Sequence, residues 1–365
     1  MAASASLRSE TDSLRPPLPE GWSVPESCED VIVVDGLSIR RAGIASVAPD
    51  GEEITGSAAS LDEAHAGEIS AASRSWFELL ERASIVEAMR APAAAYELRT
   101  ASGTFVRTCA HRDLFPESDD PSTWRYARSN GVAIHGDWSR ACERALWELA
   151  ERDRVLASWN GEVRPLRIDG APVGLGATTC YDWSAWLFPE EGADSFSRGI
   201  SVVGVFGFPT RPDAPLAIGF AARPDRQAAL DDATREAVQL LGFLWGEPVA
   251  EVSASTEPTA MGHLDFHQAH AHHSLLRSWL AGEHVRADAA RLHDSPTLLG
   301  AQATRNRTVG RIGAEEVLFA DLTPRWLGGG LRVAKAICAT ARPLVFGESP
   351  LSADVPVERR IHPIS

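Results

Sequence analysis

The sequence predicts an α+β fold in which mixed β-sheets are packed by helices. Short strand-like stretches alternate with helical stretches, but without the regular βαβ period that a doubly wound parallel sheet requires. The chain has 365 residues, 44% of them hydrophobic and 23% charged, which is typical of a soluble globular protein. Two of the helical stretches carry the same E-x-x-E-R pattern in an apolar context. The chain therefore reads as one large unit built around repeated helices.

The N-terminal part is predicted to be a flexible tail followed by a β-hairpin. Residues 1–28 are rich in Ser, Pro and charge, so the folded domain is expected to span residues 29–365. Residues 31–48 read as two strands around a turn at Asp35-Gly36. Residues 49–60 are expected to form a loop.

A long helix is predicted next, over residues 61–89. Ser60 is a candidate N-cap because Glu63 stands three residues later, as in a capping box. Pro92 ends the helical pattern.

The rest of the chain is predicted to alternate between strands and helices. A helix is expected from Trp138 to Trp159 with Asp137 as its N-cap. Further elements are a hairpin over 96–108, strands at 200–208, 216–222, 317–322 and 331–340, helices at 226–244 and 262–280, and an irregular C-terminal tail.

The repeated pattern is the strongest chemical signal. Glu78, Glu81 and Arg82 form the first E-x-x-E-R set, and the second set lies seventy residues later at Glu148, Glu151 and Arg152. Residues three and four apart share one helix face, so each helix presents two carboxylates together. A third helix repeats the three-residue spacing with Glu236 and Gln239. Carboxylate oxygens suit Mg²⁺, but the same pattern also occurs on solvated helix faces, where such pairs add about 0.2–0.5 kcal/mol.

Composition excludes several function classes. The net charge of −15 argues against a general nucleic-acid binder. The only lysine, Lys335, lacks the G-x-x-x-x-G-K-[ST] context of a phosphate loop, so an ATP site here must use another design. The five cysteines form no C-x-x-C pair, which fits a reducing cytoplasm. The N-terminus has no apolar signal region and no run approaches a membrane span, so we expect a cytoplasmic protein without membrane contact.

The histidine-rich segment is a weaker signal with an ordinary interpretation. Five histidines cluster between His263 and His273, and the spacing of His263 and His267 would suit zinc. No Glu follows His263 as H-E-x-x-H requires, so a polar helix or surface loop is favoured.

Four motifs resemble the YcaO family. They are ISAASRSWFELLERAS, SNGVAIHGDWSRACERALWELAERDRVLASW, AALDDATREAVQ and ADLTPRWLGGGLRVAKAICATARPLVFGE, in this order. The last is similar to the late segment of the azoline-forming branch. The resemblance covers about residues 30–365 and implies a YcaO-like fold.

The resemblance implies a site for ATP and Mg²⁺ outside the phosphate-loop folds. The implied metal ligands are Glu78, Glu81, Glu148 and Glu151. The implied nucleotide contacts are Arg82, Arg152, Ser129, Asn130, Glu236 and Gln239.

The resemblance also implies a reaction: ATP-dependent activation of a backbone amide in a ribosomally made precursor peptide. Attack by a neighbouring Cys, Ser or Thr yields a thiazoline or oxazoline. Relatives use sulfide or an amine and form thioamides or macrocyclic amidines. No part of the sequence resembles the adenylating-enzyme-like domain that binds the leader peptide, so a separate partner protein is expected. A homodimer is compatible with this arrangement.

Two departures from the family pattern bear on catalysis. The chain ends in IHPIS instead of the proline-rich tail thought to approach the active site, leaving His362 and Pro363 as the implied catalytic residues there. Arg74 stands where the family has a serine. The alternative hypothesis is therefore a YcaO-like subunit that has lost catalysis and serves as a scaffold.

Overall fold

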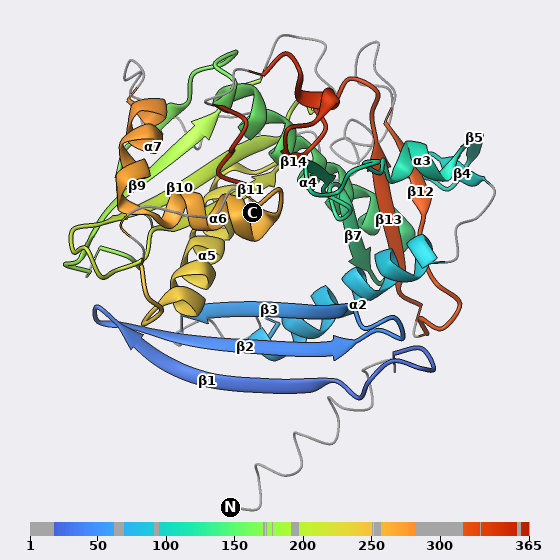
Figure 1. Ribbon diagram of the computed structural model, residues 1–365, viewed down its shortest axis with the longest axis horizontal. Helices are drawn as coiled ribbons and strands as arrows, with labels where there is room; N and C mark the ends of the chain where they lie inside the picture. The colour runs from blue at the N-terminus through green and yellow to red at the C-terminus, as the bar shows by residue number, and fades with distance from the viewer. Residues whose placement is uncertain are drawn as a thin grey trace, which may run out of the picture.

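The computed structural model has the α+β architecture expected from the sequence (Figure 1). It describes residues 18–61, 69–90, 95–170, 172, 174–176, 178–190, 197–249, 251, 257–281, 317–328, 330–355 and 359–364. Within these residues, no helix is long and apolar enough to cross a membrane.

The chain begins with a three-stranded antiparallel sheet. Its strands are β1 (Glu26–Val34), β2 (Leu37–Val47) and β3 (Glu53–Leu61), in that order. Asp35 and Gly36 both have positive φ, 47° and 87°, as the tight two-residue hairpin turn between β1 and β2 requires. This hairpin was predicted from the Asp-Gly pair and is confirmed.

Three further sheets form the rest of the β-structure, and all their described pairings are antiparallel. One has the order β11-β10-β9-β8, one the order β5-β4-β12-β13-β7, and the third pairs β14 with β6. The bounds are β4 Tyr96–Arg99, β5 Phe105–Cys109, β6 Trp124–Tyr126, β7 Val132–His135, β8 Leu166–Ile168, β9 Tyr181–Phe188, β10 Ser201–Pro209, β11 Ala217–Arg223, β12 Leu318–Asp321, β13 Arg332–Ile337 and β14 Val345–Gly347.

Three long helices lie between these sheets. Helix α2 packs on β2 and β3 and reaches β7, α4 packs against both β13 and β11, and α5 packs on β10, β11 and β3 (Figure 1). The helix bounds are α2 Ala71–Arg90, α3 His111–Leu114, α4 Trp138–Trp159, α5 Arg226–Leu244, α6 Ala260–Gln268 and α7 His273–Leu280, with single 3₁₀ turns at His270–His272 and Pro350–Ser352.

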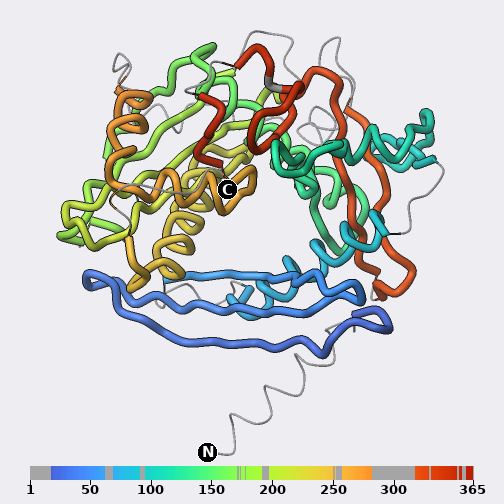
Figure 2. Tube along the Cα trace, in the orientation of Figure 1, coloured from blue at the N-terminus to red at the C-terminus, as the bar shows by residue number. Residues whose placement is uncertain are grey.

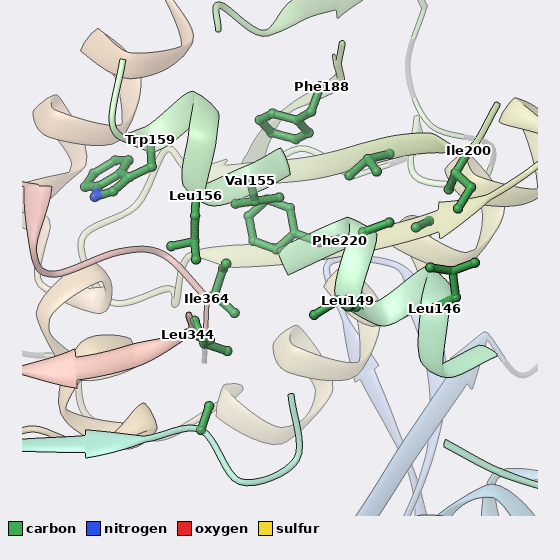
Figure 3. Packing of buried hydrophobic residues seen from close by; sticks show 14 of the residues in the cluster. Leu146, Leu149, Val155, Leu156, Trp159, Phe188, Ile200, Phe220, Leu344 and Ile364 are labelled. Atoms are coloured by element: carbon green, nitrogen blue, oxygen red, sulfur yellow. The ribbon is translucent and has the colours of Figure 1, made fainter. Parts of the chain in front are cut away.

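Helix α4 is the central element of the main core. Asp137 caps its first turn by accepting a 2.8 Å hydrogen bond from the backbone N–H of Arg140, as predicted. At its other end, Gly161 and Glu162 donate to the carbonyls of Ser158 and Ala157, which is a Schellman ending. Figure 3 shows its apolar side chains packed against the aromatic rings of the four-stranded sheet and against Ile364 from the C-terminal segment.

The N-terminal boundary of the fold differs from the prediction. The tail was expected to extend through residue 28, but β1 begins at Glu26, and Trp22 packs against the core beneath β2 and α2. The backbone N–H of Ser23 also donates to the carbonyl of Val47. Composition missed this because the first half of β1, ESCED, is polar and almost the whole edge strand is exposed. Residues 1–17 lie outside the described part of the chain.

The stretch predicted as a loop at 49–60 contains strand β3, so this prediction is wrong. Ser60 pairs with Arg40 in the sheet and is not a helix cap, and α2 begins only at Ala71. Glu63 lies outside the described residues. Strand β3 reads EITGSAASL, and its small residues have weak β-propensity. The small side chains leave room for helix α2 to pack very closely on this strand.

Two glycines allow helices to approach strands at main-chain distance. A Cβ on Gly56 in β3 would overlap the carbonyl oxygen of Ser75 in α2, and a Cβ on Gly219 in β11 would overlap the carbonyl of Ala233 in α5. The helix residue three positions later is a glutamate in both cases, Glu78 and Glu236. The two helix–strand pairs therefore have the same local geometry.

Gly56→Ala tests this close contact. The new methyl group would push α2 away from β3, and we expect the free energy of unfolding to fall by about 1–3 kcal/mol, as for other overpacked sites. Urea unfolding measures the change. Gly136→Ala is the matched control, because a Cβ there meets nothing within 4 Å. Equal stability of the two variants would contradict the close-packing account.

Candidate ATP and magnesium site

Five glutamates from the three long helices form one electrostatic cluster. Glu78 and Glu81 come from α2, Glu148 and Glu151 from α4, and Glu236 from α5. Glu81 is repelled by both Glu78 and Glu148, and Glu151 is repelled by Glu148. Glu236 is repelled by Glu151. The structure thus brings together the helices that the sequence pattern singled out.

The carboxylates are oriented by main-chain N–H groups of neighbouring strands. Ser57 N–H in β3 donates to Glu78 at 2.6 Å, and Ile134 N–H in β7 donates to Glu81 at 3.1 Å.

The remaining helices repeat this arrangement. The N–H of Phe220 in β11 donates to Glu236 at 3.3 Å, and Gly131 N–H, directly before β7, donates to Glu148. Each of these glutamates therefore has one oxygen held by a main-chain N–H, and the other oxygen of Glu78 pairs with Arg82.

The cluster is costly without a bound cation. Desolvation, together with repulsion between neighbouring carboxylates, raises the pKa of Glu148 and of Glu151 to about 7 and that of Glu236 to about 8. Desolvation and the nearby Glu148 and Glu78 raise the pKa of Glu81 well above its usual range. A divalent cation would favour the ionised forms of all these groups.

The two predicted arginines have different environments. Arg82 pairs with Glu78 at 2.6 Å and is about half exposed. Burial alone would lower the pKa of Arg152, but the carboxylates of Glu151, Glu148 and Glu236 outweigh it and raise that pKa. The Nε of Arg152 is buried and lies 3.5 Å from Oε1 of Glu151, so the guanidinium is ion-paired with Glu151 but makes no hydrogen bond through Nε within the described residues.

Three polar residues predicted to contact the nucleotide lie around this cluster. Gln239 donates from Nε2 to the carbonyl of Ser57 at 3.2 Å, beside the Glu78 anchor. Asn130 is buried, and its Oδ1 has no partner within the described structure. Ser129 is exposed on the same turn.

Lys335 belongs to the site although its sequence context gave no signal. It is only 2% exposed, and its charge favours the ionised form of Glu148. Burial lowers the pKa of Lys335 to about 8. No motif around it predicted this position, because strand β13 places it there by pairing with Val132 of β7.

His362 and Pro363 lie elsewhere. His362 is buried against His263 and Phe346, and its Nε2 lies 3.0 Å from the carbonyl of Val345. Two histidines of α6 contact main-chain carbonyls of the C-terminal segment: His263 contacts that of His362, and His267 contacts that of Ile361. The segment runs beside α6 (Figure 2). Within the described residues, none of the hydrogen bonds, ion pairs or ring contacts of this segment involves the five glutamates. Their catalytic assignment therefore stays a prediction.

The sequence left open whether His263 and His267 could bind zinc, and the structure gives these histidines another role. His263 and His267 each face a carbonyl of the C-terminal segment, and desolvation lowers their pKa values to about 4 and about 3. They hold that segment as neutral side chains.

The donor set fits Mg²⁺ bound with a nucleotide. The available ligands are carboxylate oxygens, and Mg²⁺ typically takes one or two of these together with phosphate oxygens. Within the described ranges, no three His, Cys, Asp or Glu side chains converge as a complete metal cage. The Arg152 guanidinium, paired with Glu151, supplies positive charge for phosphate, and the unpartnered Asn130 Oδ1 supplies an acceptor for a nucleotide N–H or O–H group.

A family model decides the relationship. Residues 93–342 match the model described as YcaO cyclodehydratase, ATP- and Mg²⁺-binding. The chain belongs to the YcaO family. It is therefore an ATP-dependent enzyme by family, as the motifs implied, although Glu78 and Glu81 lie before the matched range. No curated protein matches the sequence.

Solved structures share the YcaO fold. The chain resembles YcaO from Methanopyrus kandleri bound with AMPPCP and Mg²⁺, with 18% identity over 87% of this chain and 85% of that one and a TM-score of 0.60. A heterocyclase in complex with substrate and cofactor gives 17% identity and a TM-score of 0.60; the match covers 99% of this chain but only 56% of that one. The E. coli microcin synthetase McbBCD complex gives 12% identity over 95% and 97%, with a TM-score of 0.55.

The raised pKa values predict how stability depends on pH. In the metal-free protein, Glu148, Glu151 and Glu236 hold protons up to about pH 7–8, whereas their model values are 4.5. Raising the pH from about 6.5 to 8 should therefore remove the stability that these protonated glutamates contribute; the buried histidines His263 and His267, whose pKa values burial lowers, act in the opposite direction, but mainly below pH 6.5. Urea unfolding at several pH values measures this loss of stability, and Glu236→Gln should make it smaller. An unchanged pH profile in the variant would contradict the coupled cluster.

Proposed function

We propose that this protein activates backbone amides of a ribosomally made precursor peptide and cyclises Cys, Ser or Thr residues to thiazolines or oxazolines. The observation that carries the proposal is the carboxylate cluster on α2, α4 and α5, in a chain that belongs to the YcaO family. The late segment at residues 320–348, which resembles the azoline-forming branch, supports ring formation. The heterocyclase and microcin synthetase structures support it through the shared fold.

In this proposal Glu78, Glu81, Glu148 and Glu151 hold Mg²⁺, with Glu236 completing the wall of the pocket. ATP and Mg²⁺ would supply the phosphoryl group that turns the amide oxygen into a good leaving group and the charge that stabilises it. The strand N–H groups fix the carboxylates before the ligand arrives, so little reorganisation is needed on binding.

The arginines and amides would orient the nucleotide. Arg152, which is ion-paired with Glu151, would contact phosphate through its guanidinium. Arg82 would either leave Glu78 to contact phosphate or keep Glu78 in position. Asn130 and Gln239 line the edge of the pocket, and Ser129 lies beside Asn130 on the same turn. A precursor peptide and a separate leader-binding protein complete the system.

Phosphate release and peptide mass test the proposal together. The protein, its leader-binding partner, the precursor peptide and Mg-ATP should release phosphate and remove one water from the peptide for each ring. Glu151→Gln should reduce both by about 100-fold or more, because a charge placed for the transition state is lost. Glu143→Gln on the same helix is the control and should retain activity. Wild-type protein that releases no phosphate with a partner proven to bind the leader would contradict the enzyme proposal and favour the scaffold.

One observation favours a second candidate. The C-terminal segment packs against α6 and β14, and in the described part of the chain it makes no hydrogen bond or ion pair with the five glutamates. Amide activation with an external nucleophile, giving a thioamide or an amidine, would not require the proline-rich tail. The same assay separates the thioamide, which exchanges oxygen for sulfur, whereas an amidine loses one water as an azoline does and is distinguished by tandem mass spectrometry of the product.

A further inference from the structure

The single lysine of the chain occupies an unusual position. Lys335 lies in the middle of β13 and is almost fully buried, with Phe115 and Tyr126 presenting ring faces 5.3 and 5.6 Å from its Nζ. A buried ammonium group is costly, and an apolar side chain of the same size often serves stability as well or better. Its presence therefore calls for a role that a methionine could not fill.

The ammonium group holds one turn of the chain. Nζ donates to the carbonyl of Asn130 at 2.7 Å and to that of Arg128 at 3.1 Å. The same turn carries Gly131, whose N–H donates to Glu148. The turn thus connects the lysine on one side with a site carboxylate on the other.

One N–H donor of the ammonium group is not used by these two carbonyls. The group has three N–H donors, and two are used by the carbonyls. Glu148 is the acidic side chain whose charge it influences. Lys335 therefore acts on Glu148 in two ways, through the Gly131 turn and through its own charge.

We propose that Lys335 is a positioning residue of the site, which fixes the 128–131 turn and Glu148 relative to each other for binding of the magnesium–nucleotide complex. This inference rests on the proposed function only in requiring that the site takes Mg-ATP. It assigns a role to a residue on a β-strand that lies outside the glutamate-bearing helices. It also accounts for the buried Asn130, whose carbonyl is bound by Lys335 while its Oδ1 remains unpartnered.

The absence of other lysines makes a site-specific experiment available. Growth on ¹⁵N-lysine places the label only at Lys335, so the protein has one ammonium signal in a ¹⁵N spectrum. Addition of Mg²⁺ with the non-hydrolysable analogue AMPPCP should shift this signal in proportion to the bound fraction measured by calorimetry. A signal that stays in place while calorimetry shows saturation would overturn the inference.

Substitutions provide the second test. Lys335→Met keeps the apolar volume but removes the charge, and we expect it to weaken binding of Mg-AMPPCP about tenfold, because a charged hydrogen-bond network is lost. Lys335→Arg should recover part of the affinity. Arg332→Met, on an exposed position of the same strand, is the control and should bind like wild type.

The outcomes separate the two proposals. Lowered stability of Lys335→Met with unchanged affinity would show a merely structural lysine and overturn the inference alone. Wild-type protein that does not bind Mg-AMPPCP would overturn the ATP site and the inference with it. If Lys335→Met does not fold, the arginine variant and the ¹⁵N signal still decide.

Discussion

The site depends on hydrogen bonds from strand backbones to helix carboxylates. An N–H of β3, one of β11 and two at β7 each direct one glutamate, and these hydrogen bonds require helices and strands to pack at main-chain distance. Gly56 and Gly219 make this approach possible on two of the three helices. Main-chain groups of the sheets therefore fix the carboxylate positions, although the glutamates come from three separate helices.

This precision has an electrostatic cost. The five glutamates repel one another in a poorly solvated space, and Arg152 and Lys335 offset only part of that repulsion. A cluster of carboxyl groups with raised pKa values around a buried arginine is suited to bind an added cation together with an anion. Magnesium and a nucleotide triphosphate provide both, which connects the geometry with the family to which the chain belongs.

Much of this could be predicted from the sequence, and the limits have physical causes. The helices and their glutamates were predictable because E-x-x-E-R spacing fixes a common face without knowledge of the tertiary structure. Strand β3 was missed because its small residues have weak β-propensity. They allow α2 to pack closely on the strand, which the sequence alone does not reveal. Lys335 was dismissed because its role arises only when β13 pairs with β7. Several short strands, such as β6 and β14, also depend on tertiary pairing and leave little local signal.

The most direct test of the account is a crystal structure with AMPPCP and Mn²⁺ in place of Mg²⁺, since the anomalous signal of manganese locates each ion independently of the model. Manganese is expected between the carboxylates of α2 and α4. The triphosphate should lie beside Arg152, and the adenosine should point toward Asn130 and Gln239. Manganese bound away from these glutamates, or a nucleotide bound outside the space between α2, α4 and α5, would contradict the account.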